Sequence, residues 1–169
     1  MGVETSRGER AMSEFIVRMM TANDVPQVEA IEKEAYRDRW SDFAYLSELK
    51  DNELAYYVVL APKEDESKVA AYGGFWAILD EGHITKVTVS REYRGKKLSK
   101  QLLLGMLKLA KLKGAARVTL EVRVSNKAAI GLYHKMGFTD SGVRPHYYTD
   151  NNEDAYIMWR ELDDIEVGE

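Results

Sequence analysis

The spacing of hydrophobic residues changes along the chain from a strand period to a helix period and back. From Leu98 to Lys113 apolar residues recur about every 3.6 positions, which predicts an amphipathic helix, and Gly114 supplies its C-terminal stop. From Arg117 to Val124 apolar and polar residues alternate, which predicts a strand with Glu121 on its polar face. The chain therefore combines helices and strands.

The N-terminal third predicts one short strand and two helices. Residues 15–17 form the first β-prone run. Asn23 or Asp24 can cap a helix that has Pro26 in its first turn. Residues 37–40 break this helical pattern, and Ser41-Asp42 can cap a second helix.

Three more strands are expected before the long helix. Residues 53–60 form one, and residues 69–79 form another that contains Gly73-Gly74, where we expect a bulge or bend. Residues 80–82, Asp-Glu-Gly, predict a hairpin turn into the strand 83–89. The first four strands should be mostly antiparallel.

The C-terminal third predicts one more helix between strands. Ser125-Asn126 caps a helix that runs to about Met136, and Gly137 ends it before Phe138 resumes a strand. The stretch from Tyr147 through Asn152 is interpreted as a loop or hairpin that feeds a final strand.

Length and composition predict one compact α/β domain. The chain has 169 residues, of which 45% are hydrophobic, enough to form a real core. We expect a disordered leader at residues 1–13, the domain at residues 14–162 and an acidic tail at residues 163–169. A net charge of -4 with mixed-sign segments gives no reason to expect nucleic-acid binding.

The absence of two features points to the cytoplasm. No apolar run approaches the roughly 18 residues of a membrane span, so no membrane association is expected. Cysteine is absent, which excludes disulfides and thiolate metal sites and fits a reducing compartment. His83, His134 and His146 lack the spacing of metal ligands, so we expect no metal. Serine-hydrolase and Walker A patterns are missing as well.

The turn before the long helix is the first candidate binding element. A glycine turn that opens a helix offers backbone N–H groups and a positive dipole end to a phosphate. Gly95 lies in this turn, and Lys96, Lys97 and Lys100 add positive charge. The alternative interpretation is a solvated basic turn.

The motifs REYRGKKLSKQLL, LEVRVSNKAAIGLYHKMGF and YYTDNNEDAYIM, in this order of elements, resemble the GCN5-related N-acetyltransferases (GNAT). Within that family the chain is most similar to the enzymes that acetylate protein N-termini, including the ribosomal-protein-alanine acetyltransferases. The resemblance covers about residues 16–162. It implies the GNAT fold, an α/β arrangement in which a mixed, mostly antiparallel sheet is flanked by helices on both faces.

The resemblance implies acetyl-CoA as co-substrate. Arg94 takes the first position of the family's phosphate loop. Lys97 stands where the family usually has glycine, and Ser99 stands where it usually has glycine or alanine. A lysine at positive φ would be strained. The strand 87–89 matches the one that pairs with the pantetheine arm, and the Val87 amide would face the thioester oxygen. The cofactor-binding residues implied are Val87, Thr88, Val89, Arg94, Gly95, Lys96, Lys97, Leu98, Ser99, Lys100 and Asn126.

The resemblance also assigns catalytic roles to Glu121 as general base and Tyr133 as general acid. An α-amine is partly neutral near neutral pH, so a modest base is sufficient. The alternative for Glu121 is a solvated residue or an ion pair with Arg117 or Arg123. For Tyr133 the alternative is core packing beside neighbouring apolar residues.

Two aromatic pairs are the candidates for acceptor binding. Tyr147 and Tyr148 are similar to the tyrosines that close over an acceptor N-terminus, and Tyr36 and Trp40 match the opposite wall. Either pair could instead be surface packing. A cleft closed on both sides favours a flexible chain terminus over a lysine on a folded surface.

The predicted function is therefore acetyl transfer from acetyl-CoA to the α-amine of a protein, with a ribosomal protein as a candidate acceptor, by an enzyme expected to be monomeric. Two alternatives remain. One is a lysine or small-molecule amine acetyltransferase of the same fold, and the other is a non-catalytic acyl-CoA-binding module.

Overall fold

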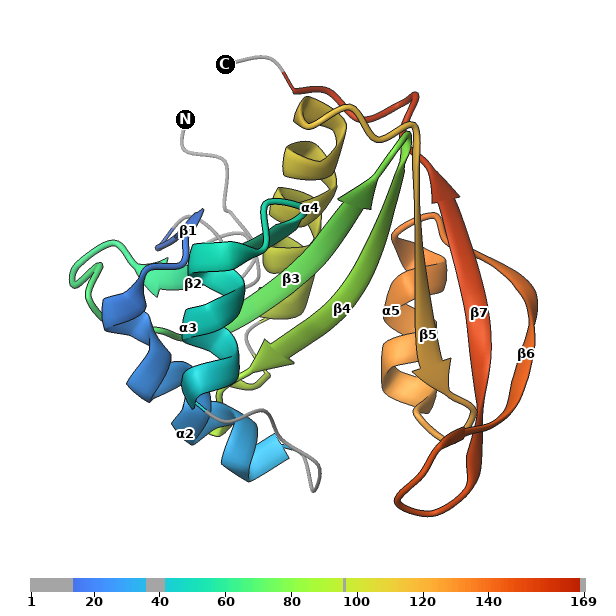
Figure 1. Ribbon diagram of the computed structural model, residues 1–169, viewed down its shortest axis with the longest axis horizontal. Coiled ribbons are helices and arrows are strands. Elements are labelled where there is room, and N and C mark those ends of the chain that lie inside the picture. Colours follow the sequence, from blue (N-terminus) through green and yellow to red (C-terminus); the bar gives the residue numbers. More distant parts are fainter. Residues whose placement is uncertain (1–13, 36–41, 96, 168–169) are drawn as a thin grey trace, which may run out of the picture. The chain divides into compact units, whose positions relative to one another are not determined.

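The computed structural model describes residues 14–35, 42–95 and 97–167 (Figure 1). Seven strands form a sheet in the order β1-β2-β3-β4-β5-β7-β6. This mixed, mostly antiparallel sheet with its helices confirms the predicted fold class. The elements are β1 Phe15–Met19, α2 Val25–Ala35, α3 Asp42–Asp51, β2 Ala55–Pro62, β3 Ala71–Ile78, β4 Glu81–Val89, α4 Leu98–Leu112, β5 Arg117–Arg123, α5 Lys127–Lys135, β6 Thr139–Tyr148 and β7 Glu153–Glu161.

Two compact units make up the chain, and strands β3 and β4 and helix α4 each contribute to both. The first unit contains the described parts of residues 1–74 and 86–106. In it β1 and β2 are antiparallel, from the pair Phe15↔Pro62 to the pair Met19↔Val58. The last six residues of β2 are all buried, which explains why this strand is almost continuously apolar.

Helices cover both faces of the sheet in the first unit. On one face Tyr72 of β3 packs in a core cluster with Val28 of α2 and Tyr45 of α3. The next residue, Gly73, points to the other face, where a Cβ would collide with Met106 of α4. A Cβ at Gly74 would likewise collide with the ring of Tyr57. Because both residues lack a side chain, Met106 and Tyr57 can pack directly against the backbone of β3.

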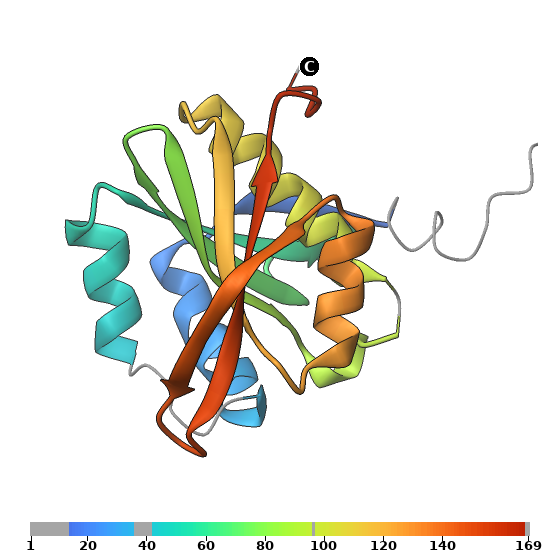
Figure 2. The same cartoon turned by 90° about the vertical axis from the view of Figure 1, so that its right-hand side faces the viewer.

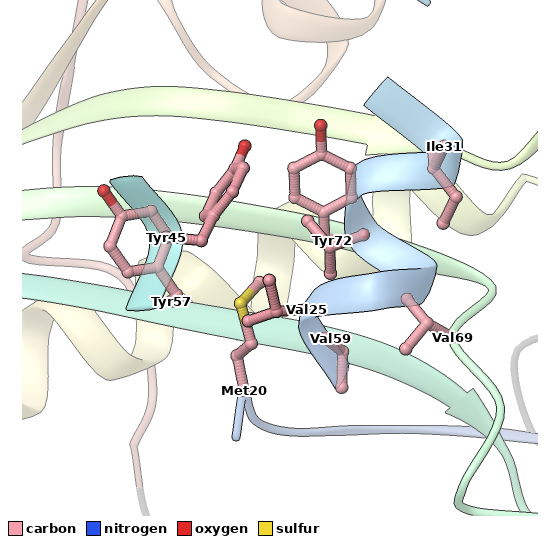
Figure 3. Close-up of a cluster of buried hydrophobic side chains, with 9 residues drawn as sticks. Met20, Val25, Ile31, Tyr45, Tyr57, Val59, Val69 and Tyr72 are labelled. Carbon is pink, nitrogen blue, oxygen red and sulfur yellow. The ribbon is translucent and has the colours of Figure 1, made fainter. Parts of the chain in front are cut away.

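A carboxylate lies fully buried beside the aromatic core of the first unit. Figure 3 shows the ring of Tyr45 between those of Tyr57 and Tyr72, and it meets both edge to face. Oε1 of Glu32, on α2, accepts hydrogen bonds from the hydroxyls of Tyr45 at 2.5 Å and Tyr72 at 3.2 Å. The same oxygen lies 2.9 Å from Nζ of Lys86 on β4. One carboxylate thus joins two helices and two strands.

The second unit consists of residues 75–85 and the described part of residues 107–169. Here β4 and β5 pair in parallel, and β5 pairs antiparallel with β7 along its whole length. Strands β6 and β7 form a long hairpin (Figure 2). Helix α5 connects β5 to β6 and is joined to β7 by Nε of Arg160, which donates to the carbonyl of Met136 at 2.6 Å.

Several predicted boundaries are confirmed and others are shifted. Gly114 and Gly137 end their helices at φ values of 98° and 93°. The hairpin turn lies at residues 79–80, so two of the three predicted turn residues belong to β4. Helix α2 begins at Val25, directly after Asp24 and within the predicted start. A 3-10 turn at Ala22–Asp24 precedes it, and this turn is capped by Thr21, whose N–H donates to the Asp24 carboxylate.

The remaining expectations for the chain ends and linkers are only partly covered. Predictions for residues 1–13, for Tyr36, Trp40 and the Ser41 cap, and for Lys96 lie outside the described residues. In the segment 163–167 Ile165 is buried, and its carbonyl accepts a hydrogen bond from Lys111. Among the described residues no helix is long and apolar enough to cross a membrane.

We predict that Glu32→Gln lowers the free energy of unfolding by about 3 kcal/mol, because it removes the buried negative charge that pairs with the largely buried ammonium of Lys86. Urea denaturation measures this change. Glu34→Gln, an exposed substitution on the same helix, should change stability by less than about 0.5 kcal/mol. Equal stability of the two variants would contradict a structural role for the ion pair.

Candidate active site

The predicted phosphate loop lies in the first unit, between β4 and α4. A 3-10 turn at Arg91–Tyr93 follows β4, and the backbone then passes through Gly95 at a φ of 85° and Lys97 at a φ of 59°. Leu98 is buried and anchors the first turn of α4. This first turn contains no acidic residue, so its N–H groups and the helix dipole keep their positive character.

These residues fit a phosphate ligand. A Cβ at Gly95 would have no atom within 4 Å, so its backbone is open to a ligand. The side chains of Arg94, Lys97 and Lys100 are exposed around it, and Ser99 is half-buried. Backbone N–H groups at a helix start surrounded by cations are the usual chemistry of an anion site. Lys97 adopts the positive φ that the sequence identified as a source of strain for a lysine.

The predicted strand before this loop is present as the end of β4. Thr88 is buried, while Val87 and Val89 are half-buried on the other side of the strand. The three residues belong to the end of β4 that lies in the first unit. Their role toward a pantetheine arm stays a prediction.

Glu121 lies in the second unit, on β5. Val118, Leu120 and Val122 are buried on one side of this strand, as predicted, and Glu121 projects from the other. Its Oε2 lies 2.6 Å from Nε2 of His83 on β4, and its Oε1 lies 3.4 Å from Nε of Arg144 on β6. Only 8% of the Glu121 side chain is exposed. Each oxygen of this nearly buried carboxylate therefore faces a basic side chain.

The neighbours of Glu121 determine its charge. Burial alone would raise the pKa of Glu121, but the hydrogen bond and charge of His83, together with the charge of Arg144, lower it below its ordinary value. Glu121 is therefore ionised at neutral pH. Arg117 and Arg123, the two partners considered from the sequence, pair with other carboxylates.

Tyr147 lies close to this carboxylate. Its partial burial and the negative charge of Glu121 raise the pKa of the Tyr147 phenol, while Arg144 opposes the shift. Tyr147 meets the ring of Tyr148 edge to face, with the centroids 5.0 Å apart. The structure thus brings together the predicted base and the predicted acceptor-binding tyrosine pair.

An irregularity in β6 places these tyrosines. Arg144 pairs with Ala155 and Tyr148 pairs with Glu153, so three residues of β6 lie opposite one residue of β7. Within this bulge His146 has a φ of 55°, and its N–H donates to the carboxylate of Asp154 at 2.9 Å. Tyr147 and Tyr148 therefore end strand β6 and do not belong to a loop.

The tip of the hairpin is fixed by Arg123 of β5. Its guanidinium donates to both carboxylate oxygens of Asp150, at 3.0 and 3.1 Å, and to Glu153 at 3.3 Å. It also lies over the ring of Tyr148, 3.9 Å from the centroid. This arginine connects the strand that carries Glu121 to the tyrosine pair.

The start of helix α5 is held at the same hairpin. The predicted cap is confirmed, because Oδ1 of Asn126 accepts the N–H of Ala129 at 3.2 Å. The N–H of Ser125 donates to Glu153 at 2.8 Å, and this bond, with those from Asn151 and Arg123, lowers the pKa of Glu153 to about 2.

Tyr133 lies on α5 with 9% of its surface exposed, and its ring contacts Phe138 at a centroid distance of 5.5 Å. The packing expected of a core tyrosine is thus present. This contact involves the ring of Tyr133 and not its hydroxyl, so the acid role of the hydroxyl stays a prediction.

Sequence reasoning missed the two basic partners of Glu121. His83 was considered only as a metal ligand, and Arg144 was not singled out. The parallel register His83↔Thr119 and the pairing of β6 with β7, which lies beside β5, bring them to Glu121, and neither feature has a local signature in one sequence. Within the described residues no group of three or more His, Cys, Asp or Glu side chains could hold a metal ion.

The acetyltransferase (GNAT) family model matches residues 25–138, which span the predicted phosphate loop, Glu121 and Tyr133. This chain belongs to the GNAT family. It is therefore an acyltransferase, and GNAT enzymes use acetyl-CoA as co-substrate.

Several relatives of this GNAT chain are similar over most of their length. A Bacillus subtilis protein named provisionally as a ribosomal protein bS18-alanine N-acetyltransferase is 41% identical over 85% of this chain and 93% of its own. An N-alpha-acetyltransferase of Sulfurisphaera tokodaii is 33% identical over 86% of this chain and 92% of its own. The crystal structure of the ribosomal-protein-S18-alanine N-acetyltransferase from Escherichia coli has a TM-score of 0.77 and 31% identity, covering 88% of this chain and 94% of that one.

We predict that Lys97→Gly raises the free energy of unfolding by roughly 0.5–1 kcal/mol, because a left-handed lysine costs more than the chain entropy that glycine adds. Urea denaturation checks this stability gain. Lys100→Gly, at a helical position, should instead destabilise by about 1 kcal/mol. A loss of stability in Lys97→Gly would show that the loop is not strained.

We predict that His83→Ala raises the pKa of Glu121 toward its ordinary value, because the largest contributions that lower it come from His83. The acid limb of the activity profile should then move to higher pH, since Glu121 becomes protonated earlier as the pH falls. Carboxyl ¹³C NMR titration measures the shift. His134→Ala, which removes an exposed pair with Asp140, is the control and should leave Glu121 unchanged.

Proposed function

We propose that this GNAT enzyme is an N-terminal protein acetyltransferase that transfers the acetyl group of acetyl-CoA directly to the α-amine of a protein. The observation that carries this proposal is the ionised, nearly buried Glu121 beside Tyr147. The relatives named as alanine N-acetyltransferases and N-alpha-acetyltransferases support the choice of acceptor. Ribosomal protein bS18, which some of those names specify, is the first acceptor to test.

Glu121 is the proposed general base. An α-ammonium group has a pKa near 7.7–8.0 and is partly neutral at pH 7, whereas a lysine side chain near 10.4 is almost fully charged. Glu121 accepts the proton that the amine loses, directly or through a water molecule. The neutral nitrogen then forms a bond to the acetyl carbonyl carbon.

Tyr133 is the proposed general acid. A phenol has an ordinary pKa near 10 and keeps its proton at neutral pH. When the carbon–sulfur bond breaks, the proton of Tyr133 goes to the departing thiolate. The second proton, which the nitrogen loses once it is bonded to the carbonyl carbon, restores the Tyr133 phenol. Acetyl transfer then leaves the acetylated N-terminus and free CoA as products.

The predicted phosphate loop and β4 are proposed to hold the acyl donor. The amides at the start of α4, with Arg94, Lys97 and Lys100, would bind the diphosphate and ribose phosphate of CoA. The backbone of residues 87–89 would pair with the pantetheine arm, and the Val87 amide would stabilise the oxyanion. Asn126 is the proposed contact from α5. Acetyl-CoA supplies the acetyl group as a thioester.

Tyr147 and Tyr148 are the proposed acceptor-binding residues, together with Tyr36 and Trp40. Arg123 holds the hairpin tip that carries the tyrosine pair, so this wall needs little ordering when a peptide binds. A flexible N-terminus can reach a carboxylate that is 8% exposed more easily than a lysine on a folded surface can.

We predict that Glu121→Gln lowers kcat/KM by 10²–10⁴-fold, the usual contribution of a general base, and most strongly below neutral pH where less amine is neutral. Tyr133→Phe should slow turnover with little change in acetyl-CoA affinity. Mass spectrometry of alanine-starting peptides with free and with blocked N-termini measures activity and acetylation site together. Modification of internal lysines in the blocked peptides would contradict N-terminal specificity, and wild-type rates in either variant would remove that residue from the mechanism.

A further inference from the structure

The two contacts of the Glu121 carboxylate differ in strength. His83 lies 2.6 Å from Oε2, within the range of a short charge-assisted hydrogen bond. Arg144 lies 3.4 Å from Oε1, beyond that range, and 55% of its side chain is exposed to solvent. A loose, exposed ion pair contributes little free energy. The contact at Oε1 is therefore the easier one to displace.

The basic side chains are more exposed to solvent than the carboxylate that they contact. Glu121 is nearly buried, while His83 and Arg144 are 37% and 55% exposed. Among the described neighbours on β5 and β7, Ile157 is the apolar partner of Glu121 and Arg123 is held by Asp150 and Glu153. Tyr147 of β6 interacts electrostatically with both Glu121 and Arg144. An incoming amine must therefore meet Arg144 or His83.

The backbone of Arg144 is fixed although its side chain is exposed. Arg144 pairs with Ala155 of β7, and the following Pro145 restricts it to an extended conformation. The pairs from Gly142 to Arg144 are regular, because one irregularity of β6 lies before Gly142 and the other begins only after Arg144. The guanidinium can therefore leave Oε1 by side-chain rotation, without a change in the strand.

We propose that Arg144 occupies, at Oε1 of Glu121, the subsite that the acceptor α-ammonium takes, and that the acceptor displaces it on binding. Arg144 is thus a positioning residue that competes with the acceptor for the base. It keeps Glu121 ionised and paired before the acceptor arrives, which avoids an unpaired buried charge. The proposal rests on the proposed function, because it assumes Glu121 is the base.

The test compares Arg144→Gln with the wild type in steady-state assays on an alanine-starting peptide at saturating acetyl-CoA. KM for the peptide should fall about two- to fivefold, the range corresponding to an exposed ion pair, and the effect should appear in KM more than in kcat. Arg117→Gln removes an exposed arginine from the same strand as Glu121 and is the charge-matched control.

A double-mutant cycle separates competition from a general structural effect. In a Glu121→Gln background the Arg144 substitution should no longer lower KM, because the ion pair is already absent. A KM that rises in Arg144→Gln, or a fall that persists in the Glu121→Gln background, overturns the competition. If the wild type does not acetylate the peptide at all, the proposed function fails first, and this inference fails with it.

Discussion

A carboxylate that is taken out of water must be paired, and this constraint organises both units of the chain. In the first unit Glu32 is fully buried and joins α2, α3, β3 and β4 through two tyrosines and Lys86. In the second unit Glu121 is nearly buried and is paired by residues from β4 and β6. The difference lies in solvent access. Lys86 is largely buried, whereas the partners of Glu121 are partly exposed, so the first pair suits a fixed scaffold and the second suits exchange with a ligand.

The same hairpin that supplies Arg144 also supplies Tyr147, and its geometry depends on residues elsewhere. Arg123 holds the tip through Asp150 and Glu153, and the His146 bulge turns the following tyrosines. Glu153 at the same time binds the N–H of Ser125, directly before the Asn126 cap of α5. The proposed base, acceptor wall and acid-bearing helix of the second unit are therefore linked through one small network of charges.

Local signals predicted much of this architecture, and long-range ones did not. The alternation of β5 placed Glu121 on the polar side, and the glycines after α4 and α5 marked both helix ends. The departure at Lys97 identified a position where the backbone angle matters, and the structure has a positive φ there. His83 and Arg144 could not be found in this way. They meet Glu121 through a parallel strand register and through the pairing of β6 with β7, which depend on packing between segments 23 or more residues apart.

A carboxylate with a lowered pKa is a weak base, and this favours an α-amine as acceptor. Such a base removes a proton efficiently only from a group that is already partly neutral near pH 7, as an N-terminus is and a lysine is not. The basic neighbours of Glu121 increase this discrimination, because they lower its pKa further. They also repel a cation that cannot lose its proton. The electrostatics around Glu121 thus favour the same acceptor as the names of the relatives do, by a separate physical route.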